Sequence, residues 1–321
     1  MDLVAADIGG THARFAIATI DGGRVAGLAD QRVLKTADHA SLQTAWEAYG
    51  DMIGRPLPRA AAIAVASPVG GEIIKLTNNP WVIQPATLCE RLSIDDHVLI
   101  NDFGAVGHAV AQARADDFEH LCGPDVPLPD LGVITICGPG TGLGVAQLLR
   151  TASGYHVVET EGGHIDFAPH DPIEDTLVAR LRKVFNRVSA ERVCAGPGII
   201  GIYESLAALE NRAKPELTDK DIWSAALDGG DSLALAALDR FCLALGSVAG
   251  DLALAQGARA VVIAGGLGYR LKQRLPLSGF ADRFAAKGRF QQMMASLPVK
   301  VITLAEPGLF GAAAAFAQIH G

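Results

Sequence analysis

The stretch VAADIGGTHARFAIA, residues 4–18, places an aspartate, two glycines and a threonine between two short apolar runs. Both runs have the length and composition of β-strands, and the compact segment between them predicts a hairpin. Gly9 and Gly10 can adopt backbone angles that other residues avoid, and they let a ligand approach the main chain closely. Asp7 can accept hydrogen bonds from its own turn or contact a ligand, and the stretch alone leaves both interpretations open.

The segment GVITICGPGTGLGVAQLLR, residues 132–150, repeats this plan of an apolar strand, a glycine-rich turn and a second apolar strand. Thr11 follows the glycines in the first copy, and Thr141 follows them in the second. A third strand, within RAVVIAGGLG (259–268), again ends in paired glycines. Internal similarity at this long spacing predicts two related α/β halves rather than an array of short repeats.

The composition is that of a folded protein with more than one core. The chain has 321 residues, of which 50% are hydrophobic and 19% are charged. The net charge of −8 disfavours nucleic acid and anionic membranes as main partners. Five cysteines without a close pair indicate a reducing compartment and no structural zinc. Neither a signal peptide nor an apolar run of about 18 residues is evident, so we expect a cytoplasmic protein with no nucleic-acid or membrane partner.

Apolar spacing and turn residues predict further elements along the chain. A capping aspartate, Asp171, and helical spacing predict a helix over 171–185. Its buried face is expected to comprise Ile173, Leu177, Leu181 and Val184. Residues 232–257 predict a long, largely buried helix, and the Pro/Gly-rich loop CGPDVPLPDLG (122–132) is the best candidate for a domain boundary. TNNPW (77–81) predicts a polar turn with a packing tryptophan rather than the wall of a pocket.

Two standard nucleotide-binding motifs are absent from the sequence. The pattern G-x-x-x-x-G-K-[ST] cannot occur because the chain has no Gly-Lys pair, and G-x-G-x-x-G fails in 138–144. The pair of turns in which a threonine follows glycines remains. Successive N–H groups in such a turn form an anion-binding concavity, to which the threonine hydroxyl adds a donor. One such hairpin is commonly only a hairpin, but two of them, one in each half, indicate a phosphate chain held from both sides.

Asp102 ends the predicted strand HVLIND (97–102), and Asn101 precedes it. Open α/β sheets bind ligands at the carboxyl ends of their strands, so Asp102 is a candidate for chemistry. An aspartate here is also a common helix N-cap, and the local sequence does not separate the two roles. Asn101 can serve a sugar hydroxyl as donor and acceptor, but asparagine is also common in turns.

The segment ETEGGHIDFAP (159–169) gathers Glu161, His164 and Asp166. A metal site is one interpretation, although the spacing matches no familiar zinc pattern. Recognition of a polyol is another, because carboxylates accept hydrogen bonds from adjacent sugar hydroxyls and histidine can donate or accept. A solvated loop is the third, and the segment by itself leaves all three open.

Seven short motifs together carry a resemblance to a known family. In chain order they are DIGGTHAR (7–14), LTNNPW (76–81), INDFGAV (100–106), GPGTGLGV (138–145), EGGHIDFAP (161–169), SAERVCAGPG (189–198) and IAGG (263–266). They strongly resemble bacterial ATP-dependent glucokinase, and the likeness extends to the EPGLFGAAAAF ending (306–316). That family belongs to the hexokinase/actin-like superfamily, which implies a two-domain α/β actin-like ATPase (ribonuclease H-like) fold with a central ligand cleft. The implied domains are 1–112 plus 302–321, so that the last strand and helix return to the first domain, and 113–301.

The resemblance also implies roles for the matching residues. Asp102 resembles the catalytic base. The implied hexose ligands are Asn101, Asp102, Glu161, His164 and Glu191, although Glu191 by itself would be an ordinary helix charge. The implied ATP-binding residues are Ala6, Asp7, Ile8, Gly9, Gly10 and Thr11 in the first phosphate loop, Gly138, Gly140 and Thr141 in the second, and Gly265 and Gly266 on the adenosine side. Asp7 is further implied to face Mg²⁺ through water.

The function implied by this resemblance is a glucokinase, which transfers the γ-phosphoryl of ATP to the C6 hydroxyl of glucose at the first step of glycolysis. His12 departs from the asparagine common in the family, and the cysteine-rich zinc motif of the related repressor/kinase sugar kinases is missing from the sequence. The alternatives are a kinase for another hexose and a non-catalytic actin-like sugar sensor. Family members are often dimers, so a homodimer is a further expectation.

Overall fold

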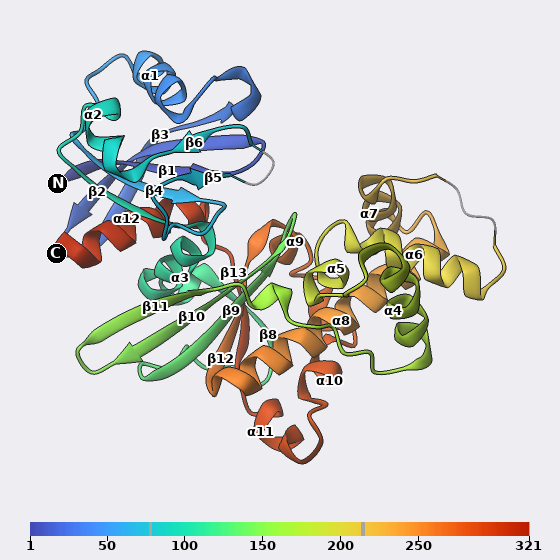
Figure 1. The fold of residues 1–321 in the computed structure, drawn as a ribbon. Helices are drawn as coiled ribbons and strands as arrows, with labels where there is room; N and C mark the ends of the chain where they lie inside the picture. Colours follow the sequence, from blue (N-terminus) through green and yellow to red (C-terminus); the bar gives the residue numbers. More distant parts are fainter. Residues whose placement is uncertain (77–78, 213–215, 321) are drawn as a thin grey trace. The chain divides into compact units, whose positions relative to one another are not determined.

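The chain forms two compact units, each built on one main sheet (Figure 1). The computed structural model describes residues 1–76, 79–212 and 216–320. Unit 1 comprises Met1–Arg114, Val157–Glu159 and Leu304–Gly321, and unit 2 comprises Ala115–His156 and Thr160–Thr303.

Unit 1 has a five-stranded sheet in the order β3-β2-β1-β4-β7. The strands are β1 (Asp2–Ile8), β2 (His12–Asp21), β3 (Arg24–Lys35), β4 (Ala60–Val65) and β7 (Asp96–Asn101), and a small second sheet pairs β5 (Ile74–Lys75) with β6 (Val82–Ile83). The helices are α1 (Leu42–Ile53), α2 (Leu88–Leu92), α3 (Asp102–Gln112) and α12 (Pro307–His320). β1 is antiparallel to β2 and parallel to β4, which is parallel to β7.

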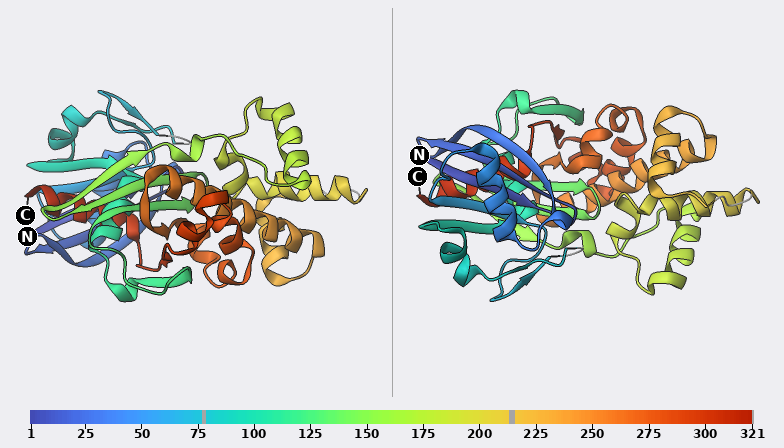
Figure 2. Two further views of the ribbon diagram at one scale, coloured as in Figure 1. Left: turned by 90° about the horizontal axis from the view of Figure 1, so that it is seen from below. Right: turned by 90° about the horizontal axis from the view of Figure 1, so that it is seen from above.

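Both faces of the main sheet of unit 1 are buried. Because side chains alternate between the two faces of a strand, β1 contributes to two cores. Val4, Ala6 and Ile8 enter the core that α1 covers, whereas Leu3 and Ala5 enter the core that α3 and α12 cover. The two views in Figure 2 show α12, in red, lying against the strands of this unit.

The small residues of α12 let it approach α3 very closely. Gly311 lies so near this helix that a Cβ atom there would be 1.7 Å from the carbonyl oxygen of Ala105. Ala312 and Ala313 of α12 are fully buried in the same core. The sequence FGAAAAF is therefore explained by helix packing, because larger side chains would hold the two backbones apart.

Unit 2 has a six-stranded sheet in the order β11-β10-β9-β12-β13-β8. The strands are β8 (Phe118–Cys122), β9 (Gly132–Pro139), β10 (Leu143–Thr151), β11 (Gly154–Thr160), β12 (Ala258–Ile263) and β13 (Val299–Ile302). The helices are α4 (Pro172–Phe185), α5 (Ala190–Cys194), α6 (Gly198–Leu209), α7 (Asp219–Asp228), α8 (Ser232–Gln256), α9 (Gly265–Arg270), α10 (Phe280–Ala285) and α11 (Gln291–Ala295). One large core joins α4, α6, α8 and α10 to a face of this sheet.

The two sheets share a plan, as the repeated hairpins predict. In unit 1 the first strand pairs antiparallel with the next strand and parallel with a later one, β4. In unit 2, β9 pairs antiparallel with β10 and parallel with β12. The following strand is parallel in both sheets, β7 beside β4 and β13 beside β12. The expectation of two related α/β halves is therefore confirmed.

Several predictions of extent are wrong. The loop at 122–132 is no domain boundary, because it joins β8 and β9 of one sheet. The last strand, β13, does not return to unit 1, because it pairs with β12 and β8 in unit 2. Val184 does not belong to the buried face of α4, since it is 74% exposed near the end of that helix.

The apolar helix α8 also corrects an expectation. Among the described residues it is long and apolar enough to cross a membrane by length and composition, contrary to the prediction that no apolar run reaches that length. Of its most apolar window, 72% is buried inside the protein. Phe241 and Leu245 are fully buried there, so the composition of α8 is accounted for by the core of unit 2.

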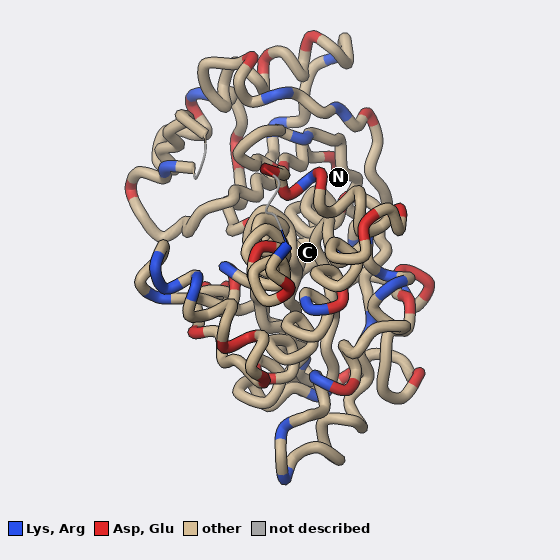
Figure 3. Tube along the Cα trace, turned by 90° about the vertical axis from the view of Figure 1, so that its right-hand side faces the viewer, with Lys and Arg blue, Asp and Glu red and all other residues tan. Residues whose placement is uncertain are grey.

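Charged residues of both signs are interspersed along the chain. In the view of Figure 3, short stretches of Lys and Arg alternate with Asp and Glu. Several of these residues pair, including Arg59 with Asp95 and Arg180 with Glu204. The pattern fits an acidic protein with mixed surface charge.

Candidate active site

The first glycine-rich turn, between β1 and β2, is held by hydrogen bonds from within unit 1. The N–H of Gly9 donates to the carbonyl of His12 at 2.9 Å. Thr36 donates from its hydroxyl to the Gly10 carbonyl at 2.8 Å and from its N–H to the Thr11 carbonyl at 3.0 Å. Asn79 donates to the Gly9 carbonyl at 3.3 Å. Three successive carbonyls of the predicted phosphate loop are thus fixed by the surrounding chain.

Asn79 and Trp81 support the packing interpretation of TNNPW. Asn79 is buried, and its side chain accepts a hydrogen bond from the N–H of Trp81 at 2.9 Å. Trp81 is fully buried and donates from its indole to the carbonyl of His39. Thr77 and Asn78 lie outside the described residues.

Asp7 lies opposite Arg14 in the register of β1 and β2. Arg14 lies 3.6 Å from the Asp7 carboxylate and 3.3 Å from that of Glu306, so one guanidinium serves two acids. Burial raises the pKa of Asp7, Arg14 opposes that effect, and Glu306 adds to it. The sequence analysis missed Arg14 and Glu306 as neighbours of Asp7, and the acid in the EPG segment before α12 was the available signal.

The donor set around Asp7 fits Mg²⁺. A carboxylate is a hard oxygen ligand, and Mg²⁺ usually keeps several waters while binding one or two carboxylates and substrate phosphates. The described residues contain no cluster of three or more metal-binding side chains. The Asp7 carboxylate, beside the predicted phosphate loop, therefore suits a metal that arrives with a nucleotide.

Asn101 and Asp102 occupy the junction of β7 and α3. Asn101 is the N-cap, since its side-chain oxygen accepts from the N–H groups of Phe103 at 2.8 Å and Gly104 at 3.2 Å. Its amide also donates to the Ser67 carbonyl at 3.4 Å. The capping role that the sequence left open for Asp102 thus belongs to its neighbour. Asp102 is the first helical residue, where the positive end of the helix dipole favours a carboxylate.

The second glycine-rich turn joins β9 to β10 in unit 2. The N–H of Gly140 donates to the Gly142 carbonyl at 2.8 Å, and Gly196 donates to the Gly140 carbonyl at 2.8 Å. The strand expected to end in the paired glycines 265–266 ends earlier, at Ile263, and these glycines begin α9. Gly265 has a φ of +77°, and a Cβ there would lie 2.6 Å from the Pro139 carbonyl. Gly265 therefore packs directly on the end of β9, next to the second turn, whereas a Cβ on Gly266 would meet no atom within 4 Å.

Glu161, His164 and Glu191 come together in unit 2. The Nε2 atom of His164 is 3.9 Å from the Glu161 carboxylate and 4.0 Å from that of Glu191. The side chains of Glu161 and His164 are more than half exposed, which leaves polar atoms accessible to a ligand. Asp166 does not join this cluster, because it pairs with Arg187 at 2.6 Å. Three convergent polar side chains with exposed atoms could donate to and accept from adjacent hydroxyls, as the polyol interpretation requires.

The loop that carries Glu161 and His164 rests on the second turn without a gap. Gly163 lies so close that a Cβ there would be 2.0 Å from the Leu143 carbonyl. Glu191 accepts from the N–H of Leu143 at 2.9 Å, and a Cβ on Gly142 would meet the same carboxylate at 2.5 Å. The predicted sugar ligands and the predicted second phosphate loop are thus parts of one packed assembly.

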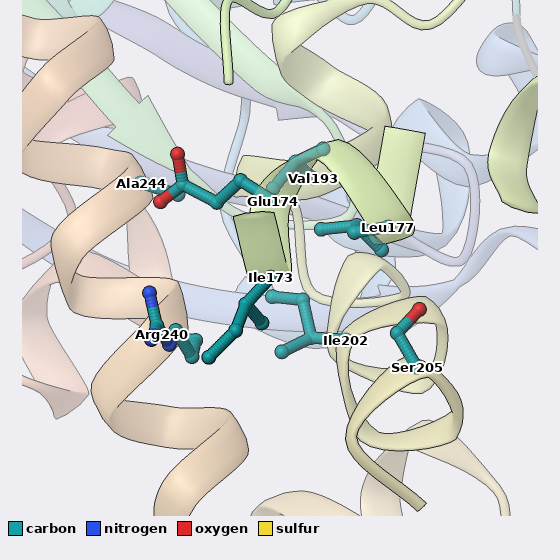
Figure 4. A pocket seen from close by; sticks show the side chains of 8 residues that line it. All are labelled: Ile173, Glu174, Leu177, Val193, Ile202, Ser205, Arg240 and Ala244. Atoms are coloured by element: carbon teal, nitrogen blue, oxygen red, sulfur yellow. The ribbon is translucent and has the colours of Figure 1, made fainter. Parts of the chain in front are cut away.

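Two pockets of unit 2 lie away from these polar side chains. One of them, of about 10 Å³, lies among α4, α5, α6 and α8, where Glu174 and Arg240 meet apolar side chains (Figure 4). That volume is close to the minimum for one water molecule. A wider cavity of about 510 Å³ is lined by residues around α10 and α11, such as Phe284 and Met294. The candidate site is accordingly defined by its polar side chains rather than by a closed cavity.

Comparison with known proteins places this chain in a family. The model of the family described as "Glucokinase" matches residues 4–319. The glucokinase of Zymomonas mobilis is 63% identical over 318 residues, which are 99% of this chain and 98% of that one. A crystal structure of glucokinase from an Antarctic psychrotroph superposes with a TM-score of 0.85 at 35% identity, covering 98% of both chains.

A more distant structure has the same fold. The ROK family glucokinase from Streptomyces griseus, solved in complex with glucose and AMPPNP, has a TM-score of 0.60 at 17% identity and covers 98% of each chain. At this identity the likeness shows the fold alone, which is the two-domain actin-like ATPase fold of sugar kinases. Together with the whole-chain match of the family model, these results show that the chain belongs to the glucokinase family.

Proposed function

We propose that this protein transfers the γ-phosphoryl group of ATP to the C6 hydroxyl of glucose, giving glucose 6-phosphate and ADP. The observation that carries the proposal is the position of Asp102. It lies on the first turn of α3, directly after the N-cap Asn101, in a chain of the glucokinase family. The glucose and AMPPNP bound to the Streptomyces griseus enzyme support the choice of both substrates.

Asp102 acts as the catalytic base. A sugar hydroxyl is a weak nucleophile, and the transition state of phosphoryl transfer is loose, so catalysis depends mainly on positioning and charge stabilisation. The Asp102 carboxylate holds the C6 hydroxyl in line with the γ-phosphorus and accepts its proton late in the transfer. Its fixed place on α3 avoids reorganisation at the moment of reaction.

The two glycine-rich turns hold the nucleotide phosphates. In unit 1, residues Ala6 to Thr11 present their turn to the phosphates, and in unit 2, Gly138 to Thr141 do the same, with Gly265 and Gly266 beside the adenosine. N–H groups and the threonine hydroxyls donate to phosphate oxygens. Asp7 would hold Mg²⁺ through water, and the metal would supply positive charge to the phosphate oxygens.

The sugar is recognised by Asn101, Glu161, His164 and Glu191. A site built to hydrogen-bond each hydroxyl rejects a wrong hydroxyl pattern strongly, because its polar groups then lose their partners. This arrangement accounts for selection of glucose over its epimers better than an apolar pocket would. The five cysteines are free thiols, which suits the reducing cytoplasm. A homodimer follows from the family resemblance alone.

The proposal is tested by measuring glucose 6-phosphate formation with wild type and Asp102→Asn. We expect the variant to bind glucose with unchanged affinity but to lose about 10²- to 10⁴-fold in kcat, the usual contribution of a general base. Asp51→Asn, at an exposed position on α1, is the matched control and should keep full activity. A near-normal kcat for Asp102→Asn would remove this residue from the role. A sugar panel in an ADP-coupled assay separates glucose from other hexoses, and sugar binding without any turnover would favour a sensor.

A further inference from the structure

Three residues of β11, Val157–Glu159, belong to unit 1, although the residues on both sides of them belong to unit 2. β11 lies beside β10 at the edge of the sheet of unit 2. The chain therefore enters unit 1 for three residues and then returns, two positions before Glu161. Within unit 1, Val157 and Glu159 lie against α3.

Glu159 contacts the backbone directly before Asp102. Its Oε1 atom accepts a hydrogen bond from the N–H of Asn101 at 2.9 Å. β7 is the edge strand of its sheet, and alternate N–H groups of an edge strand face away from the neighbouring strand. Glu159 satisfies this outward-facing group at the last residue of the strand.

The surface of α3 is shaped to receive this segment. A Cβ on Gly104 would lie 2.3 Å from Oε1 of Glu159, and the three nearest atoms all belong to that side chain. A Cβ on Gly107 would lie 2.6 Å from Cγ1 of Val157. Residues three apart share a face of a helix, so both glycines open the same side of α3 to the excursion.

We propose that Glu159 is a positioning residue for Asp102. This inference rests on the proposed function, in which Asp102 is the base. The Glu159 carboxylate accepts from the N–H of Asn101, and it also packs against the backbone of Gly104. Asp102 lies between these two residues in the chain. One side chain thus fixes the strand end and the first turn of the helix, and with them the direction of the Asp102 side chain.

Substitutions of Glu159, with a control elsewhere in unit 1, test this role. Glu159→Ala removes the acceptor, and we expect kcat for glucose phosphorylation to fall about 10- to 100-fold, with the KM for ATP unchanged, as a displacement of about 1 Å at a catalytic group would cause. Glu159→Gln keeps an oxygen acceptor, although an uncharged and weaker one, and its kcat should stay within about fivefold of wild type. Glu90→Ala, at an exposed glutamate on α2, is the control and should match wild type.

Gly104→Ala gives an independent test of the same contact. The new methyl group must displace the Glu159 carboxylate, because that side chain provides all the nearest atoms. Gly104→Ala should therefore lower kcat as Glu159→Ala does, and the double variant should be no worse than Glu159→Ala alone.

The outcomes separate this inference from the proposed function. If wild type forms no glucose 6-phosphate, the proposed function fails. If wild type is active and Glu159→Ala keeps kcat within twofold, the positioning role is refuted. A lower unfolding temperature with an unchanged kcat per folded molecule would also refute it, because it would show a purely structural contact.

Discussion

Gly163→Ala is a sharp test of how the loop with the proposed sugar ligands Glu161 and His164 is held. Gly163 lies between Glu161 and His164, in a short 3-10 helix. A Cβ at this position would be 2.0 Å from the carbonyl oxygen of Leu143, whereas real Cβ atoms essentially never come within 3.0 Å of a neighbour. The obstacle is backbone of β10, so no side chain can rotate out of the way. The loop and the hairpin must separate by about 1 Å.

The size of the effect follows from this displacement. A misplacement of about 1 Å at a substrate-positioning group costs about 10²-fold in rate, which corresponds to about 2.7 kcal/mol of transition-state stabilisation. Overpacking of a close contact also lowers the free energy of unfolding by about 1–3 kcal/mol. We therefore expect kcat/KM for glucose to fall about 100-fold in a protein that still folds.

The assay is steady-state glucose phosphorylation together with urea unfolding of the same preparations. Gly230→Ala, also in unit 2, is the control, because a Cβ at this position would meet no atom within 4 Å. It should change neither activity nor unfolding. Equal kcat/KM values for Gly163→Ala and wild type would refute the reasoning, since the loop could then move by 1 Å without loss of function.

Two further predictions concern buried charges. Burial raises the pKa of Asp7 in the folded state above its pKa of about 4 in the unfolded state. The stability that the protonated carboxyl contributes is therefore complete below the unfolded-state pKa and is lost as the pH rises through the folded-state pKa. Asp7→Asn should lose activity, because the proposed Mg²⁺ ligand is removed. The variant should nevertheless have a higher melting temperature than wild type at neutral pH, and this difference should close toward pH 4. A difference in melting temperature that does not change with pH in calorimetric scans would contradict this. Glu174→Ala should lower the free energy of unfolding by about 1–3 kcal/mol in urea titrations, because Arg283 loses one of its two carboxylate partners and keeps Asp171 at 2.5 Å. An unchanged free energy of unfolding would contradict this.

Much of the fold could be predicted from the sequence because its signals are local. Strand-turn-strand patterns identified both hairpins, and the capping aspartate of α4 was correct, since Asp171 accepts from the N–H groups of Ile173 and Glu174. The two-domain actin-like fold implied by the family resemblance is confirmed by the comparisons. The paired glycines at 265–266 were misread because an apolar run and a glycine pair can end a strand or begin a helix with equal ease.

The candidate site was less accessible from the sequence. Asn101 and Asp102 were predicted as site residues from the sequence. Which of the two caps α3 could not be predicted, because that depends on the residue at which the helix begins. The contacts of Arg14 with Glu306 and of Glu159 with Asn101 join positions far apart in the chain, so no local pattern indicates them. The roles of the individual site residues remain predictions, for which the variants above are the tests.

The route of the chain has a consequence for synthesis on the ribosome. The helix that covers one face of the first sheet, α12, is made only after the whole of unit 2. Until then Leu3, Ala5 and Ala16 lack the part of their core that α12 supplies. Unit 2 ends at Thr303, so all of its residues are made before those of α12. The growing polypeptide therefore completes its second half before its first.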